Sequence, residues 1–576
     1  MKLILKYLKR YKKLLLFDFL SVFGFALVEL GIPTIVAQMI DQGIANQDPQ
    51  FIKERTLVIL LIAVLGVFGT ICLGYCSARI SINITRDIRS DIFRRVQQFS
   101  HAEFNKFGVS SMITRTNNDA FQIQLFVNVL LRTALLTPVM FIVSMVLTIQ
   151  NSLPLSLVLA ASVPFIVAGV YIVAKKADPL STRQQKGLDK LNQVTRENLT
   201  GIRVIRAFRN DEFEMQRFAQ TNEDYTNTSR KLFKLMTITQ PLFFLMLNAV
   251  ILIIFWLSAN MINVGTLSVG QLTAFLEYCF HAMFSMMLFC TVFIMYPRAA
   301  VSASRIQAVF DTDISMVNPE NGVTETPIKG KIEFDHVDFV YPNGEEAVLK
   351  DISFKAEKGE TVAFIGSTGS GKSTLINLIP RFYDVTRGSI RIDDVDIRDF
   401  DLKALRSRIG FIPQKALLFS GSIGSNIRFG RLDAPEDEVI HSSQVAQAYD
   451  FITQKPHQFE EAIAEGGTNV SGGQKQRLSI ARALLIKPEI YIFDDSFSAL
   501  DFKTDARLRA DLKEETKDAI TLIVAQRIST IMDADQIIVL NEGKIVGHGT
   551  HHELLKNCTI YQEIAASQLS EEELAR

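Results

Sequence analysis

The sequence predicts a multidomain chain in which an all-α transmembrane domain of six helices is followed by an α/β domain. The first half contains six long apolar stretches, and the second half contains short β-rich runs separated by turns. With 576 residues, of which 48% are hydrophobic, the chain is long enough for several domains and too apolar to be disordered. Acidic and basic residues both number 61, so the charge balance predicts no nucleic-acid partner.

Each apolar stretch is long enough to cross a lipid bilayer, because about 20 apolar residues span its hydrocarbon core. The first stretch follows a lysine-rich start and could be a signal peptide. It is too long for one, contains Asp18 and Glu29, and lacks a clear cleavage site, so we interpret it as a retained helix. The six predicted spans are Leu14–Ile40, Leu57–Tyr75, Leu125–Ile149, Leu155–Ala174, Phe243–Ala259 and Leu272–Tyr296.

Basic residues are concentrated in two of the connecting segments. Cys76–Ile123 and Lys175–Lys234 are rich in Lys and Arg, whereas Gln150–Pro154 and Asn260–Gly270 contain neither. Because basic loops remain cytoplasmic, we expect a multi-pass cell-membrane protein with its amino terminus and its second half in the cytoplasm. Helical spacing of apolar residues in Leu188–Phe208 predicts that the helices continue beyond the bilayer.

A polar segment with two prolines, Ser302–Lys329, is typical of a linker. It divides the chain into a transmembrane domain at residues 1–301 and a second domain at residues 330–576. The first β-rich runs of the second domain are Ile332–Phe334, Val337–Val340 and Thr361–Ile365.

A glycine-rich loop directly follows the run Thr361–Ile365 and precedes an apolar helix at Leu375–Ile379. It fits G-x-x-x-x-G-K-[ST] in the strand–loop–helix setting in which backbone N–H groups surround phosphate oxygens. Lys372 would contact the outer phosphates, and the Ser373 hydroxyl would bind Mg²⁺. The motif therefore predicts a nucleotide site formed by Gly366, Ser367, Thr368, Gly369, Ser370, Gly371, Lys372, Ser373 and Thr374.

A second apolar run, Ile490–Asp494, is typical of a buried strand that ends in a carboxylate. Such a strand would bring Asp494 beside Ser373, where both could act on the same Mg²⁺.

Between these two motifs lies a third, which completes a resemblance to a known family. The order of motifs resembles the nucleotide-binding domain of ATP-binding cassette (ABC) proteins, and the six-helix half resembles the exporter type of that family. The matching residues are Tyr341, the glycine-rich loop, Gln414, the signature Val470-Ser471-Gly472-Gly473-Gln474, Asp494 and the turn Ser498-Ala499-Leu500-Asp501.

The resemblance implies ATP as the nucleotide and a role for each matching residue. Tyr341 would stack on adenine, and Gln414 would touch Mg²⁺ or the attacking water. The signature residues Ser471, Gly472, Gly473 and Gln474 would bind ATP held by a second subunit, with Asp501 across the same dimer interface. Glu465 and two segments of the first half, Ser111–Asp119 and Glu197–Arg206, would connect the two domains.

Two residues depart from the family pattern. Asp495 stands where the family has the Glu that acts as hydrolytic base, and Gln526 stands where it has a His. The Asp side chain is roughly 1.5 Å shorter than Glu, and an amide cannot carry the proton that imidazole can. We therefore expect a site that binds ATP and hydrolyses it slowly.

This departure favours a heterodimer whose second half-transporter supplies the intact Glu and His, as in the multidrug ABC exporters of Gram-positive bacteria that the chain resembles. The alternative is a homodimeric exporter, or a flippase of lipids or peptides. Charged residues within the spans, Glu29, Arg132, Glu277 and His281, are costly in a bilayer. We expect Glu277 and Glu29 to line a cavity for hydrophobic or cationic small molecules, with adaptable Met and Phe side chains of the sixth span as its walls.

Overall fold

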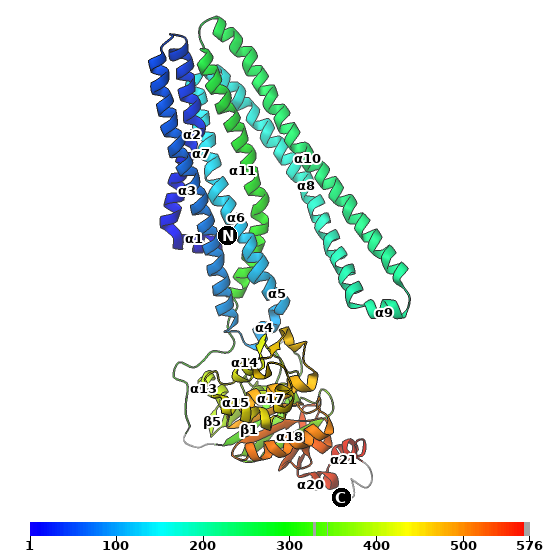
Figure 1. Cartoon of the computed structure of the whole chain (residues 1–576). Coiled ribbons are helices and arrows are strands. Elements are labelled where there is room, and N and C mark those ends of the chain that lie inside the picture. The colour runs from blue at the N-terminus through cyan, green and yellow to red at the C-terminus, as the bar shows by residue number, and fades with distance from the viewer. Residues whose placement is uncertain (327–329, 343, 570–576) are drawn as a thin grey trace. The chain divides into compact units, whose positions relative to one another are not determined.

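The computed structural model describes residues 1–326, 330–342 and 344–569, which form two compact units (Figure 1). The helical unit comprises Met1–Gln97 and Gly108–Thr312. The sheet unit comprises Gln98–Phe107 and the chain from Asp313 onward. Residues 327–329, at the end of the predicted linker, lie outside the described residues.

The helical unit confirms the six predicted spans. Six helical runs of the described chain are long and apolar enough to cross a membrane, and each contains one predicted stretch. The third run is interrupted by π-helical turns, which often mark functional sites. The helices are α1 (Lys2–Leu8), α2 (Lys12–Gln38), α3 (Pro49–Val96), α5 (Val109–Thr114), α6 (Ala120–Val129), α7 (Leu136–Asn151), α8 (Leu153–Thr200), α9 (Ile202–Ala207), α10 (Asp211–Asn263) and α11 (Val269–Phe310), with short turns η1 (Lys9–Tyr11), η2 (Met39–Ile44), η3 (Arg115–Asp119) and η4 (Leu130–Ala134).

The backbones of α2 and α3 touch near their middles. A Cβ atom placed on Gly24 of α2 would lie 3.1 Å from the Cα atom of Gly69 on α3. A Cβ on Gly66 would overlap the side chain of Val28. Small residues at this crossing therefore allow the two helices to pack without intervening side chains.

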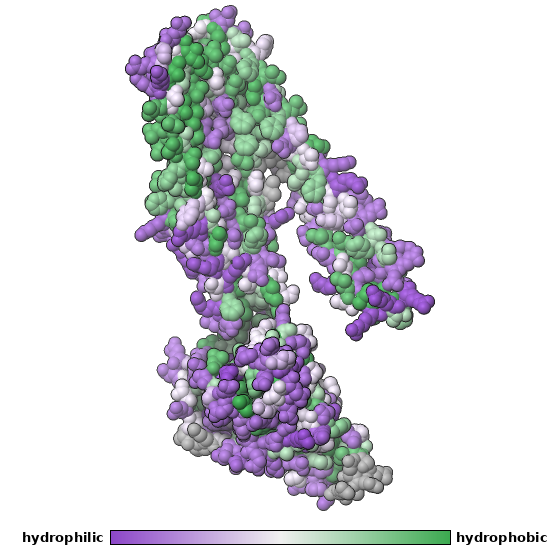
Figure 2. Space-filling model, in the orientation of Figure 1, coloured by the Kyte–Doolittle hydropathy of each residue, from purple (hydrophilic) through white to green (hydrophobic). Residues whose placement is uncertain are grey.

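Helices α8 and α10 form a long hairpin with α9 at its tip, and this hairpin diverges from the other long helices of the unit (Figure 1). Its apolar surface lies toward one end, and polar side chains cover most of the part near α9 (Figure 2). The helices therefore continue well beyond their apolar stretches, as Leu188–Phe208 predicts.

Helix α11 continues to Phe310, so the linker does not begin at Ser302 as predicted. The polar residues that suggested a linker face a buried carboxylate instead. Ser302 donates a hydrogen bond to Asp119 with an Oγ–Oδ1 distance of 3.0 Å, and Arg305 pairs with the same carboxylate at 3.3 Å. These contacts explain how a polar stretch remains helical.

The sheet unit contains a six-stranded sheet in the order β12-β11-β3-β10-β9-β6, a four-stranded sheet in the order β2-β1-β4-β5, and the pair β7-β8. Strands β11, β3, β10, β9 and β6 run parallel to one another, whereas the edge strand β12 pairs antiparallel with β11. The strands are β1 (Lys331–Phe339), β2 (Leu349–Glu357), β3 (Thr361–Gly366), β4 (Arg387–Ile392), β5 (Val395–Asp396), β6 (Ile409–Ile412), β7 (Gly421–Ser422), β8 (Ala462–Ile463), β9 (Ile490–Asp494), β10 (Ile520–Val524), β11 (Gln536–Asn541) and β12 (Lys544–Gly549).

The sheet unit also contains eleven α-helices among its described residues. They are α4 (His101–Phe107), α12 (Lys372–Leu378), α13 (Leu402–Ser407), α14 (Ile423–Arg428), α15 (Glu436–Val445), α16 (Tyr449–Thr453), α17 (Gly472–Leu484), α18 (Phe502–Glu515), α19 (Ile528–Ile531), α20 (His551–Asn557) and α21 (Thr559–Ala566). Of these, α12, α13, α17, α20 and α21 contact strands of the six-stranded sheet.

Strand β1 joins two runs that the sequence predicts as separate strands. Its pairing with β2 shifts between Phe334 and Val337, and His336 adopts a positive φ of 48° at this irregularity. A bulge in one continuous strand therefore replaces the expected break.

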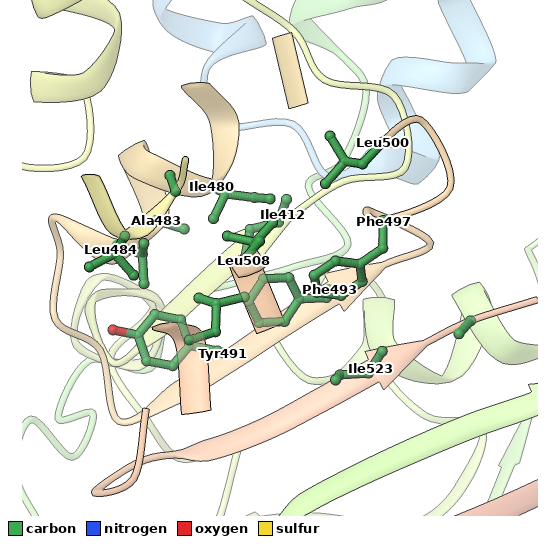
Figure 3. Close-up of a cluster of buried hydrophobic side chains, with 14 of the residues drawn as sticks. Ile412, Ile480, Ala483, Leu484, Tyr491, Phe493, Phe497, Leu500, Leu508 and Ile523 are labelled. Carbon is green, nitrogen blue, oxygen red and sulfur yellow. The ribbon is translucent and has the colours of Figure 1, made fainter. Parts of the chain in front are cut away.

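A buried cluster packs β9 against the helices that precede and follow it in the chain (Figure 3). Tyr491 and Phe493 of β9 pack with Ile480 of α17 and Leu508 of α18, all of them buried. This packing holds the carboxyl end of β9 in a fixed position. The carboxyl end of β3 lies at the same edge of the sheet, with β10 between the two strands.

Candidate nucleotide-binding site

The glycine-rich loop lies between β3 and α12 and curves around a lysine. Gly369 and Gly371 have φ angles of 85° and 101°, which side chains rarely tolerate. The Lys372 Nζ donates hydrogen bonds to the carbonyl oxygens of Gly366 and Ser367, both at 2.8 Å. Burial lowers the pKa of Lys372. The loop thus holds a buried cation in the position where the phosphates of a nucleotide would need it.

The structure brings Ser373 and Asp494 together, as their positions in the sequence predict. The Ser373 Oγ donates to the Asp494 Oδ1 at 2.9 Å, and burial raises the pKa of Asp494. A hydroxyl and a carboxylate are oxygen ligands suited to Mg²⁺, which takes its remaining ligands from water and phosphate. In the described part of the chain, no group of three or more His, Cys, Asp or Glu side chains could hold a metal. A nucleotide-bound Mg²⁺ does not require such a group, because one carboxylate together with water and phosphate oxygens can hold it.

The carboxylate of Asp495 lies between two amides. Its Oδ2 accepts hydrogen bonds from the Gln526 Nε2 at 2.8 Å and from the Gln414 Nε2 at 3.2 Å. Burial raises the pKa of Asp495. Its backbone adopts a positive φ of 47°, and its backbone N–H donates a hydrogen bond to the Val524 carbonyl. Three residues that the sequence predicts to act on ATP therefore meet through one oxygen atom.

Tyr341 follows β1 and lies beside the end of the glycine-rich loop. Its hydroxyl is 2.9 Å from the Thr374 Oγ1, and its ring meets Tyr383 edge to face at 5.3 Å. The remaining residues of the predicted loop, Thr368 among them, connect the strand to α12.

The signature residues form the amino terminus of α17. The Ser471 Oγ accepts from the Gln474 backbone, and the Gln474 side chain accepts from the Ser471 backbone, which together form a capping box. Ser471 and Gly472 are exposed, and Gly473 lies against the Ala499 carbonyl. The signature and the turn before Asp501 therefore form one continuous surface of the sheet unit.

Asp501 caps the next helix, α18. Its carboxylate accepts from the Thr504 backbone at 3.0 Å, and this hydrogen bond lowers the pKa of Asp501.

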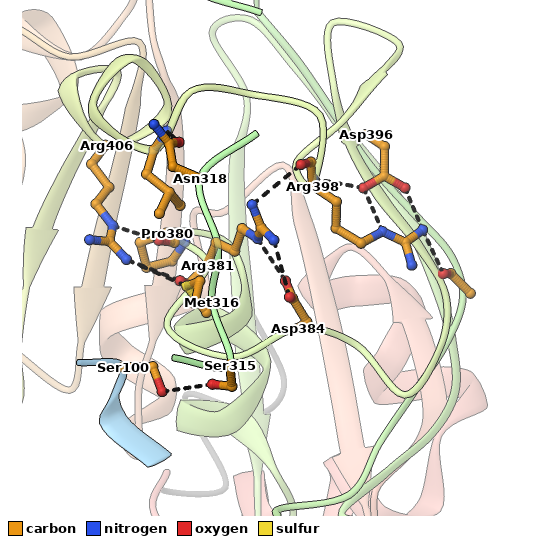
Figure 4. A network of polar contacts seen from close by, with 12 residues as sticks. Ser100, Ser315, Met316, Asn318, Pro380, Arg381, Asp384, Asp396, Arg398 and Arg406 are labelled. Atoms are coloured by element: carbon orange, nitrogen blue, oxygen red, sulfur yellow. Dashed lines mark hydrogen bonds and ion pairs between the residues drawn. The ribbon is translucent and has the colours of Figure 1, made fainter. Parts of the chain in front are cut away.

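Helix α4, from the first half of the sequence, belongs to the sheet unit, whereas Ser111–Asp119, one of the segments expected to connect the domains, belongs to the helical unit. The Ser100 Oγ lies 3.1 Å from the Ser315 Oγ (Figure 4), and the Glu103 carboxylate accepts from the Ser315 backbone. The His101 ring lies 4.8 Å from that of Phe382. The spacing Ser100-x-x-Glu103 is a helix-start signal that sequence reasoning missed.

Ser111–Asp119 lies in the third helical run, ahead of its predicted span, and Asp119 contacts α11 there. The other predicted segment, Glu197–Arg206, includes the tip of the α8–α10 hairpin. Apolar side chains are exposed there, including Leu199, Val204 and Phe208 at 72%, 62% and 79%.

The charged residues of the spans are not all brought together. The Glu29 carboxylate of α2 lies 3.4 Å from the His281 Nε2 of α11. Glu277, one turn from His281 on the same helix, is exposed.

A six-helix half joined to a sheet unit with this loop and signature defines the ABC transporter class. Residues 15–288 match the family model described as the ABC transporter transmembrane region, and residues 349–498 match the one described as ABC transporter. The chain belongs to this family. It is a multi-pass membrane protein with an ATP-binding domain, an ATP hydrolase coupled to transport, and its type is that of the ABC exporters.

Relatives match over nearly the whole chain. It is 36% identical over 570 residues, 98% of both chains, to an uncharacterized ABC transporter ATP-binding protein of Mycobacterium tuberculosis. It is 32% identical over 584 residues, 98% of this chain and 99% of the relative, to a protein of Staphylococcus aureus named Putative multidrug export ATP-binding/permease protein.

A solved structure, that of a bacterial Atm1-family ABC exporter with ATP bound, is similar in fold. It has a TM-score of 0.81 and 25% identity, and the match covers 97% of this chain and 99% of that chain.

Proposed function

We propose that this chain is one subunit of a heterodimeric exporter of hydrophobic or amphiphilic compounds, and that its own ATP site hydrolyses slowly. The observation that carries the proposal is the pair of amide hydrogen bonds on Asp495. A base must reach the attacking water, and this shorter carboxylate is bonded to Gln526 and Gln414. No imidazole stands at position 526 to take up or donate a proton.

The binding side of the site supports retention of ATP. Lys372 presents an ammonium to the outer phosphates, while Ser373 and Asp494 would hold Mg²⁺, which neutralises phosphate charge. In this proposal Tyr341 stacks on adenine, and Gln414 links the site to the membrane half. ATP would then remain bound while the other site of the dimer turns over.

The exposed signature suits a role in the partner's site. Ser471 and Gly472 present the amino terminus of α17, where backbone N–H groups and the helix dipole favour phosphate. We expect the partner to supply the Glu and the His, and to bind its ATP against this signature and Asp501. The exposed apolar tip near Phe208 would dock on the partner.

The ATPase rate of the purified full chain, alone and with its partner, tests this proposal. We expect slow hydrolysis alone and at least about tenfold faster hydrolysis in the heterodimer, because general-base catalysis contributes about 10²–10⁴-fold. Fast hydrolysis by the chain alone would favour the homodimeric exporter or flippase. A partner that lacks its own catalytic Glu would also contradict the proposal.

The charges of the spans suggest the substrate class. Glu277 is exposed on α11, and Glu29 is paired with His281, so Glu277 is the better candidate for a cationic compound. Met283, Phe284, Met286, Met287, Phe289, Phe293 and Met295 would form adaptable walls. The relative named for multidrug export supports this class. The basic segments support a cytoplasmic amino terminus and sheet unit in the cell membrane.

A Glu277→Gln variant tests the cavity. We expect transport of a cationic dye in vesicles to fall severalfold, while transport of a neutral dye remains unchanged, because the substitution removes charge and preserves shape. Glu54→Gln, on the exposed part of α3, is the matched control. Equal transport of the cationic dye by the Glu277→Gln variant and the unaltered chain contradicts the assignment.

A further inference from the structure

Gln568, in the turn after α21, makes two hydrogen bonds to the segment that carries Gln526. Its Oε1 accepts from the Ile528 backbone N–H at 2.9 Å, and its Nε2 donates to the Gln526 carbonyl at 2.8 Å. The oxygen and the nitrogen of one side-chain amide thus bind the backbone of the two residues that flank Arg527.

The turn that carries Gln568 is itself fixed in place. Tyr561 and Ala565 of α21 are buried in the core, and the Tyr561 hydroxyl lies 2.7 Å from the His551 Nδ1. The backbone N–H of Leu569 donates to the Ala565 carbonyl at 2.8 Å, and the Leu569 side chain packs against the same core. Gln568 therefore extends from a rigid support.

The segment it contacts needs such support. Helix α19 begins after Arg527, whose side chain does not cap it. The Ile528 N–H is one of the donors that a helix start leaves without a partner within the helix, and Gln568 satisfies it. Upstream, the Ala525 N–H bonds to the Phe364 carbonyl of β3. Gln526 lies between these two attachments, and its side chain reaches Asp495.

We propose that Gln568 is a positioning residue for ATP: it holds the backbone of Gln526 so that the Gln526 amide points at Asp495 and at the terminal phosphate beside it. The proposal rests on the role proposed above for Gln526 at that phosphate. The connection runs from the core, through α21 and Gln568, to the side chain that meets the reacting end of the nucleotide.

A comparison of ATP with ADP tests the connection, because only ATP carries the terminal phosphate. The probes are the Mg²⁺ complexes of ADP and of the non-hydrolysable β,γ-imido analogue of ATP, titrated into the full chain. For Gln568→Ala we expect about three- to tenfold weaker binding of the ATP analogue, as for the loss of hydrogen bonds exposed to water, and unchanged binding of ADP. Gln568→Glu keeps the acceptor for Ile528 but places a carboxylate oxygen, which cannot donate, against the Gln526 carbonyl, so it should not restore the affinity for the ATP analogue.

Two further variants complete the test. Gln562→Ala removes a glutamine of α21 whose side-chain Nε2 donates to the Leu555 carbonyl, away from Gln526, and it should leave both affinities unchanged. Gln526→Ala should reproduce the selective loss, and adding Gln568→Ala to it should cause no further loss, since both act through one amide.

Equal weakening of both nucleotides by Gln568→Ala would indicate a general structural defect and overturn the proposal. So would losses that add in the double variant. If Gln526→Ala is selective and Gln568→Ala is not, the positioning role alone fails. If Gln526→Ala is not selective, the proposed contact of Gln526 with the terminal phosphate fails, and the positioning role fails with it.

Discussion

The two sides of the ATP site differ in what surrounds their carboxylates. On the phosphate side, Asp494 accepts from the Ser373 hydroxyl, and Lys372 lies within the loop. On the hydrolytic side, Asp495 accepts from the amides of Gln526 and Gln414. Burial raises the pKa of both carboxylates, so burial alone does not distinguish them. The difference teaches that nucleotide binding and hydrolysis depend on separate side chains, and that a chain can retain one while altering the other.

The largest effect is expected from Lys372→Ala, which breaks the phosphate side. Its ammonium would make charge-assisted hydrogen bonds to the phosphates, so ATP affinity should fall by about 100-fold or more. Titration with a fluorescent ATP analogue measures this. Lys517→Ala, at an exposed lysine, is the matched control and should bind normally. Unaltered affinity of the Lys372 variant would mean that the loop is not the phosphate site.

The next effect is expected from Asp495→Glu combined with Gln526→His, which restores both family residues on the hydrolytic side. The longer carboxylate and the imidazole should raise the ATPase rate of the chain alone by about 10- to 100-fold. Asp495→Asn, equal in length to Asp and unable to act as a base, is the control and should bring no increase. A double variant as slow as the unaltered chain contradicts the explanation by these two positions.

The smallest effect is expected from Asp494→Asn, measured as thermal stability without nucleotide. The folded state raises the pKa of Asp494, so it binds the proton more readily than the unfolded chain. The penalty for ionisation is therefore absent below the unfolded pKa and complete above the folded pKa. Asn removes this penalty and still accepts from Ser373, so Tm should rise by about 2–4 °C at neutral pH.

The gain in Tm from Asp494→Asn should disappear at acidic pH, where the carboxyl group is protonated in both states. A gain that is the same at pH 4 and pH 8 would show that charge is not its cause. Loss of Mg²⁺-dependent ATP binding in the same variant would connect the stability penalty to function.

Local patterns predicted much of the fold. The six spans follow from apolar length, and the strand Ile490–Asp494 and the loop before Lys372 follow from composition and motif. Each of these signals lies within one short window of sequence, and the neighbouring structure supplies only packing. For the same reason, the pairing of Ser373 with Asp494 could be predicted once both motifs were recognised.

Features that depend on distant contacts between residues outside any recognised motif were not predicted. The helix α11 passes the expected linker start because Ser302 and Arg305 find Asp119 on another span. Strand β1 passes its polar centre because β2 pairs with it on both sides of the bulge. Gln568 lies in an ordinary polar segment, and nothing in its sequence neighbours indicates that it reaches Gln526.

The glycine crossing between α2 and α3 has a mechanical consequence. Two helices whose main chains touch at Gly24 and Gly69 cannot slide or turn against one another without collision. We therefore expect α2 and α3 to move as one rigid body. Any rearrangement that opens a transport pathway would then occur at other helix–helix interfaces of the bundle. A larger side chain at position 66 would collide with Val28 and separate α2 from α3, while the apolar sequence of the six spans would stay long enough to cross the membrane.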